Sequence, residues 1–266
     1  MTEHNLEQEL NDSEKWLVDG LAFLRSIERF KYKYRTIDKD IIVNAGETLT
    51  IYPGSVWDFS EGKGIYIQGG LIRILGTEKE PILLQAKMTS WGGISLVNTK
   101  LDNILNYTTI KDGMKDYGGG ISTYNSILTL QNCNIYECEA KYDGGGICNN
   151  NNSSISMENT VIISNRAKFG GGINNTNNSS IDLISTAVIA NNAEYYGGGI
   201  FNFINSSSRI KNTTITENYA EQGGGIYNHN GKVTSHLKSK IIQIGKNTIE
   251  NNTLENIYQH TWPIKT

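Results

Sequence analysis

The chain contains the sequence Gly-Gly-Gly-Ile five times, and the isoleucines of these copies are 26, 26, 27 and 26 residues apart. A fixed period of this length indicates a solenoid, in which each repeat forms one coil and stacks on its neighbours. A diverged first copy ends at Ile94, 27 residues before Ile121. The five clear copies are Gly118 to Ile121, Gly144 to Ile147, Gly170 to Ile173, Gly197 to Ile200 and Gly223 to Ile226.

Each copy also carries a second pattern between the glycine triplets. A polar residue is followed at +3 by an aliphatic residue, at +6 by a polar residue or cysteine and at +8 by alanine, and apolar residues alternate just before it. This pattern predicts several short strands per coil, separated by corners. The four sets are Asn132, Ile135, Cys138 and Ala140; Asn159, Ile162, Asn165 and Ala167; Ser185, Val188, Asn191 and Ala193; and Asn212, Ile215, Asn218 and Ala220.

These observations predict an all-β fold, a single-stranded right-handed parallel β-helix of about 26 residues per coil with an N-terminal α-helical cap. Stacking places like residues above one another, so aliphatic side chains fill the interior. Asparagine amides both donate and accept, and a column of them can hydrogen bond along the stack. Cys138 falls in such a column, which favours a structural role for it.

The glycine triplets allow two interpretations. Successive glycines permit backbone angles that a Cβ atom forbids, which suits a corner against which another coil packs. A glycine loop that binds phosphate needs a following helix and usually a Lys-Ser/Thr signature, and neither follows these triplets. The repetition at one period favours the corner.

The predicted organisation has three parts: residues 1–39 form a helical cap and lead-in strand, residues 40–258 the β-helix, and residues 259–266 a C-terminal tail. Asn11 and Glu14 have the spacing of a reciprocal helix cap, and an apolar face at helical spacing follows up to Ile27. Such a segment could cover the open end of a solenoid or dock a partner. Residues 31–35 alternate lysine and tyrosine, which fits a strand better than a nucleic-acid platform in an acidic chain.

Composition restricts the classes of partner and cofactor. The net charge of -3 argues against a nucleic-acid binder. Cys133, Cys138 and Cys148 are odd in number and lack nearby histidines, so we expect free thiols, no metal site and no cofactor. Glutamates near the N-terminus replace the positive charge of a secretory signal and no long apolar run follows, so we expect a cytoplasmic protein without a membrane span. The sequence gives no prediction of the oligomeric state.

The segment entering each glycine triplet is the first candidate site. It contains aromatic and acidic residues at coil spacing, a pattern that could form a platform for sugar rings or an extended chain, a pair of catalytic carboxylates, or simply a solvated turn. The candidate residues are Asp116, Tyr117, Tyr142, Asp143, Lys168, Phe169, Glu194, Tyr195, Tyr196 and Glu221.

A second candidate column lies three residues after each isoleucine and includes Tyr124, Phe203 and His229. His229 is the one histidine within the regular array, and no serine or cysteine partner for it is indicated by spacing. We therefore expect it to be a surface histidine, and the catalytic residues, if the protein is an enzyme, stay unassigned.

The repeat Gly-Gly-Gly-Ile-x-Asn, combined with Asn-x-x-Ile-x-x-Asn-x-Ala, resembles the repeats of pectate-lyase-like right-handed β-helix proteins, especially the chlamydial-type polymorphic outer-membrane-protein repeats. The resemblance covers residues 40–258, including opening coils at Gly64 to Ile94 and a terminal sequence at Asn252 to Tyr258. It implies the fold, whereas the activities of that family range from adhesion to catalysis.

Three hypotheses about function follow. The leading one is a non-catalytic binding or scaffold module that recognises a carbohydrate or an extended protein chain on its outer face. The second is an enzyme acting on a polymer as a lyase, epimerase or hydrolase. The third is a peptide-modifying or assembly factor that docks through its N-terminal helix.

Overall fold

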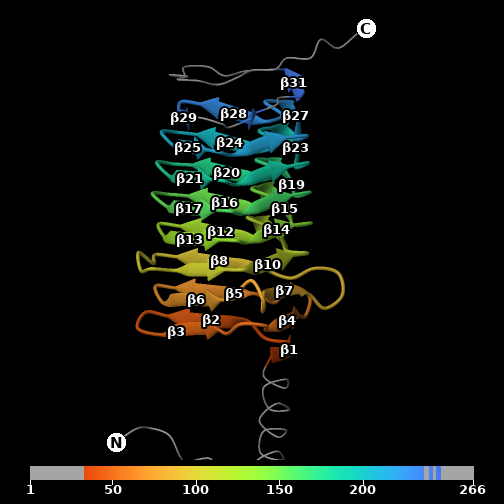
Figure 1. The fold of residues 1–266 in the computed structure, drawn as a ribbon, viewed down its shortest axis with the longest axis vertical. Coiled ribbons are helices and arrows are strands. Elements are labelled where there is room, and N and C mark those ends of the chain that lie inside the picture. Colours follow the sequence, from red (N-terminus) through yellow and green to blue (C-terminus); the bar gives the residue numbers. More distant parts are fainter. Residues whose placement is uncertain (1–32, 237–239, 242–243, 247–266) are drawn as a thin grey trace, which may run out of the picture.

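The computed structural model describes residues 33–236, 240–241 and 244–246, and its elements β1 to β31 are all strands. They form a parallel β-solenoid in which the chain rises by one coil about every 26 residues (Figure 1). The predicted all-β solenoid is thus confirmed. The predicted N-terminal helix lies outside the described residues.

Four parallel sheets run along the stack, and every coil contributes one strand to each of three or four of them. Sheet 1 contains β1 (Tyr34–Ile37), β4 (Val56–Phe59), β7 (Ile82–Ala86), β10 (Thr108–Lys111), β14 (Asn134–Tyr136), β18 (Val161–Ile163), β22 (Ala187–Ile189), β26 (Thr214–Thr216) and β30 (Lys240–Ile241). Sheet 2, whose strands follow the glycine corners, contains β2 (Ile41–Asn44), β5 (Ile65–Gln68), β8 (Ile94–Val97), β12 (Ile121–Tyr124), β16 (Ile147–Asn150), β20 (Ile173–Thr176), β24 (Ile200–Phe203) and β28 (Ile226–His229).

The other two sheets complete each coil. Sheet 3 contains β3 (Thr48–Ile51), β6 (Leu71–Leu75), β9 (Ile104–Asn106), β13 (Ile127–Gln131), β17 (Ser154–Glu158), β21 (Ser180–Ile184), β25 (Ser207–Lys211) and β29 (Lys232–His236). Sheet 4, whose strands precede the glycine triplets, contains β11 (Met114–Tyr117), β15 (Glu139–Asp143), β19 (Arg166–Phe169), β23 (Asn192–Tyr196), β27 (Tyr219–Gln222) and β31 (Ile244–Lys246).

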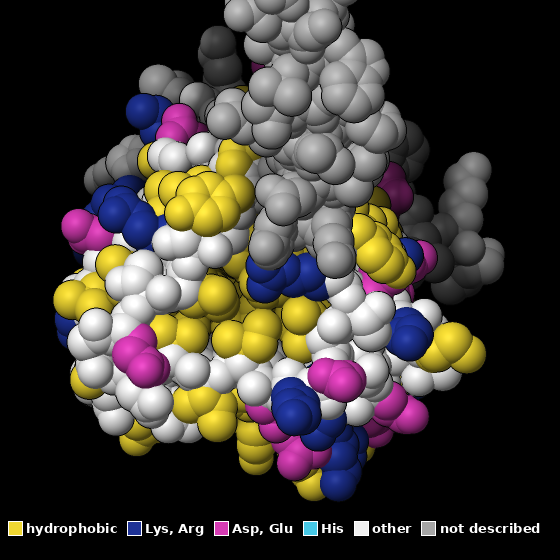
Figure 2. Space-filling view, turned by 90° about the horizontal axis from the view of Figure 1, so that it is seen from below, with side chains coloured by type: hydrophobic (Ala, Val, Ile, Leu, Met, Phe, Trp, Pro, Cys, Tyr) yellow, Lys and Arg dark blue, Asp and Glu magenta, His cyan; other side chains and the backbone are white. Residues whose placement is uncertain are grey.

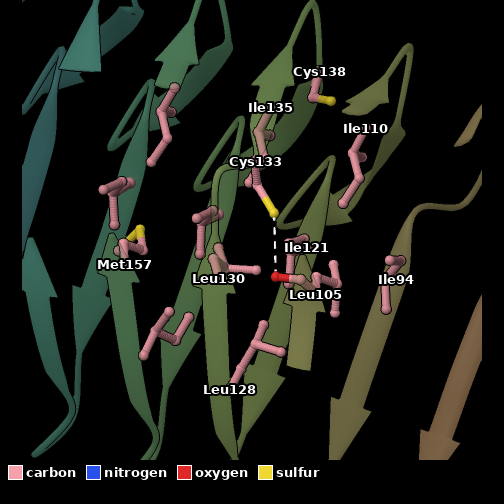
Figure 3. Packing of buried hydrophobic residues seen from close by; sticks show 14 of the residues in the cluster. Ile94, Leu105, Ile110, Ile121, Leu128, Leu130, Cys133, Ile135, Cys138 and Met157 are labelled. Atoms are coloured by element: carbon pink, nitrogen blue, oxygen red, sulfur yellow. Dashed lines mark hydrogen bonds between the residues drawn. The ribbon is translucent and has the colours of Figure 1, made fainter. Parts of the chain in front are cut away.

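The isoleucines that define the repeat stack in exact register. Each of the first four pairs with its counterpart in the next coil, and all five are buried. Inside the solenoid they meet the aliphatic column of sheet 1, and this packing is visible around Ile110, Ile121 and Ile135 in Figure 3. Each such burial contributes about 1.5–3 kcal/mol. The stacked aliphatic interior predicted from the sequence is therefore present.

One predicted asparagine column is buried and continuous. Asn191 Oδ1 accepts from the backbone amide and from Nδ2 of Asn165, both at 3.0 Å, and Asn218 Oδ1 does the same for Asn191 at 2.9 Å. The backbone amide of Cys138 donates to Asn165 Oδ1, so Cys138 occupies this column as predicted. A second corner column, at Asn132, Asn159, Ser185 and Asn212, has φ between 50° and 55°, the left-handed conformation that asparagine tolerates.

The three cysteines are free and buried. Burial raises the pKa of each thiol to about 12. The Cys133 thiol donates to the Leu105 carbonyl oxygen at 3.3 Å (Figure 3). These contacts agree with the expectation of free thiols and place them in the packed structure.

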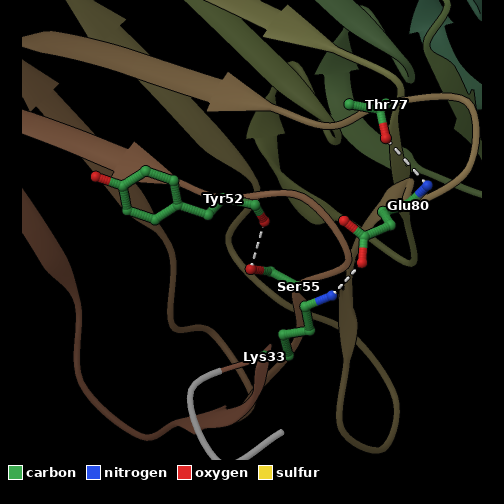
Figure 4. Close-up of polar contacts among 5 residues, drawn as sticks. All are labelled: Lys33, Tyr52, Ser55, Thr77 and Glu80. Atoms are coloured by element: carbon green, nitrogen blue, oxygen red, sulfur yellow. Dashed lines mark hydrogen bonds and ion pairs between the residues drawn. The ribbon is translucent and has the colours of Figure 1, made fainter. Parts of the chain in front are cut away.

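The N-terminal end of the solenoid carries a hollow of about 560 Å³. Figure 2 shows hydrophobic side chains at the centre of this end and charged side chains around its edge. Buried Trp57 lines the hollow, and its indole Nε1 has no hydrogen-bond partner within the described residues. On one side, Lys33 forms an ion pair with Glu80 beside the turn in which the Ser55 hydroxyl donates to the Tyr52 carbonyl (Figure 4).

Candidate functional site

The glycine triplets form tight corners between sheet 4 and sheet 2. Gly144 has a φ of 69°, and a Cβ atom there would lie 2.2 Å from the Ile147 carbonyl oxygen. The chain therefore turns back so closely that a side chain at this position is excluded. As a result, the residues just before the triplet and the residue just after the isoleucine face the same exterior corner.

Five residues immediately before the triplets form one column along this corner. Tyr117 pairs with Asp143, Asp143 with Phe169, Phe169 with Tyr196 and Tyr196 with Gln222. An irregularity in every one of these strand pairs moves the register just before the column. The preceding residues consequently belong to other positions on the surface.

The second wall of the corner comes from sheet 2. Cys148, Asn174, Phe201 and Tyr227 occupy one register column on β16, β20, β24 and β28. Their side chains alternate with the inward-facing isoleucines, so they point out of the solenoid. Three of the four are nevertheless buried, because sheet 4 packs over them.

Aromatic rings from both walls meet in the C-terminal half of the array. Phe169 lies 5.8 Å from Tyr196 and 5.7 Å from Phe201, measured between ring centroids. Tyr196 stacks on Tyr227 at 4.7 Å, and Phe201 stacks on Tyr227 at 5.5 Å. Both distances are within the range of favourable aromatic pairs.

These rings line a groove of about 390 Å³, which we call the aromatic groove. Its polar residues come from neighbouring coils and stand beside the rings. The lining consists of Asp143, Asn150, Phe169, Asn174, Thr176, Asn177, Tyr196, Phe201, Phe203, Ile204 and Tyr227. A mainly apolar hollow with a few polar groups is the usual form of a ligand site.

Asn174 lines the aromatic groove and carries a buried hydrogen-bond acceptor without a partner among the described residues. Its side chain is 1% exposed, and its Oδ1 has no hydrogen-bond partner. Among the described residues, the one other buried side-chain atom in this condition is Trp57 Nε1. Leaving a buried acceptor unpaired costs about 1–3 kcal/mol. A ligand donor would recover that free energy.

Asp143 lies on the opposite wall of the aromatic groove. Burial raises the pKa of its carboxyl group to about 6. Among the described residues, this carboxylate has neither a hydrogen-bond nor an ion-pair partner. The groove therefore holds a carboxylate without a partner, close to an Asn174 side-chain amide that makes no hydrogen bond within the described residues.

A compact polar cluster lies on the same face, toward the N-terminus. Lys115 takes the register position that Ala140 has in the next coil, and burial lowers the pKa of its amine to about 7. Its Nζ donates to Ser95 Oγ at 2.8 Å, Ser122 Oγ at 3.1 Å and the Ile94 carbonyl at 3.3 Å. Three acceptors match the three protons of an ammonium group, so this cluster is internally satisfied.

The predicted site residues separate into two groups. Asp143, Phe169 and Tyr196 line the aromatic groove, and Phe203 from the second column joins them. The Tyr117 ring contacts the Tyr142 ring outside the groove. The Nζ atoms of Lys141 and Lys168 lie 5.0 and 5.8 Å from the centroid of the Tyr142 ring. The remaining members of the first set do not line the groove: Asp116, Glu194 and Glu221 are exposed, and Tyr195 is half-buried with its ring 5.5 Å from Phe169.

The second column is also divided. Tyr124 is 48% exposed and lies outside the aromatic groove, whereas the Phe203 ring is 5.4 Å from both Phe201 and His229. Among the described residues, His229 has this ring contact and no hydrogen bond to a nucleophile. The geometry therefore associates His229 with the aromatic cluster.

Several groove residues are absent from the sequence-based candidates, among them Asn174, Phe201 and Tyr227. These three follow the repeat isoleucine directly and vary between coils, whereas the residues around them repeat. This variation at an outward-facing position was the sequence signal that could have identified them as site residues. Interpreting it requires the knowledge that sheet 4 and sheet 2 meet at an exterior corner.

Asp143 makes stability depend on pH. Because its pKa is about 6 in the folded protein and 3.8 in the reference state, the folded protein binds the proton more tightly between these values. Its stabilising contribution is complete below pH 3.8 and is lost as the pH rises through 6.

We therefore expect wild type to lose stability relative to Asp143→Asn between pH 4 and pH 7, since the amide does not titrate. Urea unfolding of both proteins across this range measures the difference. Parallel stability curves would contradict the raised pKa.

Comparisons of this chain with protein-family models, with curated proteins and with solved structures find no match. The function must therefore be argued from the groove itself. Within the described residues, no helix has the length and apolar character required to cross a membrane.

Proposed function

We propose that the protein is a non-catalytic binding module that holds a carbohydrate chain in the aromatic groove. The observation that carries this proposal is the convergence of Phe169, Tyr196, Phe201 and Tyr227 from two sheets onto one hollow. Aromatic faces pack well against the apolar faces of sugar rings, and the unpaired acceptors suit hydroxyl donors. A groove along stacked coils also suits an extended chain.

Binding is favoured over polymer-cleaving chemistry by the placement of the acids. Paired acid and base catalysis needs two carboxylates that converge on one bond. Asp143 is flanked in its column by Tyr117 and Phe169, while Asp116 and Glu194 are exposed and outside the groove. We place the fold with the pectate-lyase-like right-handed β-helices as part of this proposal, on the strength of the repeat pattern.

Replacing Tyr196 with alanine is expected to weaken glycan binding about fivefold to tenfold, because one aromatic wall of the groove is removed. A glycan array identifies the ligand, and isothermal titration then measures its affinity for wild type and variant. Circular dichroism establishes that the variant keeps its β structure.

Two variants locate the effect. Tyr124→Ala removes an exposed tyrosine that does not line the groove, so it should bind like wild type. Tyr142→Ala removes the ring that contacts Tyr117 on the neighbouring surface. It should reduce glycan affinity less than Tyr196→Ala does. If Tyr196→Ala and Tyr124→Ala bind equally, the groove is not the binding site.

A further inference from the structure

Two side chains of the aromatic groove carry hydrogen-bond acceptors without partners. Asn174 Oδ1 is buried without a partner, and the Asp143 carboxylate has none among the described residues. Asp143 therefore requires a donor from the ligand, whereas the Asn174 amide can both accept and donate. A ligand carboxylate beside Asp143 would instead meet a negative charge.

The positions of the two acceptors are linked through Cys148. Cys148 pairs with Asn174 in the register of sheet 2. Burial is the main cause that raises the pKa of its thiol to about 12, and the nearby charges of Asp143 and Lys115 act on this pKa in opposite directions. Asp143 and Asn174 thus border the same short section of the corner, and both line the groove.

The lysine of the neighbouring polar cluster is already satisfied. Lys115 donates to Ser95, Ser122 and Ile94, and Ser122 stands two coils before Asn174 in the same column. Two coil spacings correspond to about 10 Å. Asp143 therefore lacks a cationic partner within the described part of the chain, and a bound cation would compensate its buried charge.

The rings beside these acceptors favour the same ligand chemistry. Phe169, Tyr196, Phe201 and Tyr227 present aromatic faces, which attract cations as well as the apolar faces of sugar rings. A protonated amine on a sugar ring combines both features. An extended lysine side chain would use the amine but would leave the broad aromatic wall largely uncovered.

We propose that the aromatic groove binds an unacetylated amino sugar, whose ammonium group pairs with the Asp143 carboxylate and whose hydroxyl groups hydrogen bond with the Asn174 amide while its ring lies on the aromatic wall. This inference rests on the proposed carbohydrate-binding function and specifies the sugar class. It excludes uronic acid chains as preferred ligands, because their carboxylates would face Asp143.

The test compares four probes of equal length by isothermal titration at pH 7: tetramers of glucosamine, N-acetylglucosamine and galacturonic acid, and tetralysine. We expect the glucosamine tetramer to bind at least tenfold more tightly than the other three, since a charge-assisted hydrogen bond is gained. Asp143→Asn should abolish this preference, and Asp116→Asn, which removes an exposed acid outside the groove, should preserve it.

Asn174→Leu adds a readout that separates binding from folding. Leucine has nearly the same shape and removes the unpaired acceptor, so the variant should have a higher melting temperature than wild type and a lower affinity for the glucosamine tetramer. A loss of both stability and affinity would mean that Asn174 is structural and would contradict its assignment to the ligand.

The outcomes distinguish this inference from the function on which it rests. Equal affinity for the glucosamine and N-acetylglucosamine tetramers, with loss of both in Tyr196→Ala, overturns the amino-sugar assignment and retains glycan binding. Preference for galacturonate also overturns it. Tetralysine binding as tight as that of the glucosamine tetramer, and sensitive to Asp143→Asn, overturns the assignment to a sugar.

Discussion

Replacing Gly145 with alanine is expected to destabilise the protein by about 4 kcal/mol or more, because the new Cβ would collide with backbone of the next coil. It would lie 2.4 Å from the carbonyl oxygens of Arg166 and Gly171 and 2.5 Å from the Arg166 amide nitrogen. Backbone in a stacked coil cannot move aside without separating the sheets on either side of the corner. Urea unfolding and the yield of soluble protein measure the effect.

Gly62→Ala is the matched control. Gly62 has a positive φ of 68°, which Gly145 does not have, but a Cβ atom there would have nothing within 4 Å. Its cost is restricted to backbone strain of about 1–2 kcal/mol. If both alanine variants lose the same stability, the glycine corners are not closely packed against the neighbouring coils. The exterior corner would then not result from the exclusion of side chains at the glycines.

Asn191→Ala should have the second largest effect, a loss of about 3–5 kcal/mol. The amide of Asn191 accepts from Asn165 through two bonds and donates to Asn218 and to the Ile162 carbonyl. Truncation leaves several buried donors and acceptors unpaired at once, each costing about 1–3 kcal/mol with partial relaxation. Thermal unfolding followed by circular dichroism gives the melting temperature for comparison with wild type.

Cys138→Asn should act in the opposite direction. Cys138 stands at the N-terminal end of the same column, where its amide reaches Asn165 but its thiol makes a long contact of 3.4 Å with the Tyr136 carbonyl. By analogy with Asn165 Nδ2 and the Ile135 carbonyl, an asparagine here would reach the Ile110 carbonyl. We expect a gain of about 1 kcal/mol. Destabilisation by both variants would show that shape, and not hydrogen bonding, controls the column.

The repeat period predicted the main features of the fold because stacked coils force like residues into like environments. The spacing of Ile121, Ile147 and their successors identified the interior, and Asn165, Asn191 and Asn218 identified the buried corner column. The position of a residue within the repeat was enough to predict both the interior and the buried corner column. The helix predicted before residue 33 lies outside the described residues and stays a prediction.

The candidate site was predicted less completely because it depends on two strands meeting outside the solenoid. Sequence indicated Asp143, Phe169 and Tyr196, but it gave no means of separating them from Asp116 or Glu194, since an irregularity in register makes that separation. Phe201 and Tyr227 follow a buried isoleucine by one residue, so alternation identifies them as outward and nothing more.

A second interior ladder shows another limit of pattern reading. Asn149, Asn175, Asn202 and Asn228 point into the solenoid, where Nδ2 of each of the first three donates to the Oδ1 of the next. Polar residues at inward positions contradict simple alternation of apolar and polar residues. They are accommodated because each amide is paired by its counterpart one coil away.

The arrangement of the sheets determines how the molecule would carry a mechanical load. Hydrogen bonds between parallel strands of successive coils run along the long axis, so tension along that axis stretches them directly (Figure 1). Interfaces between coils bear the load in series, and the sheets within one interface share it in parallel. Three sheets join the coils that precede β11, and the fourth is added where β11 pairs with β15. Within the described part of the chain, the section that contains the aromatic groove is thus held by more strands than the N-terminal coils beneath it.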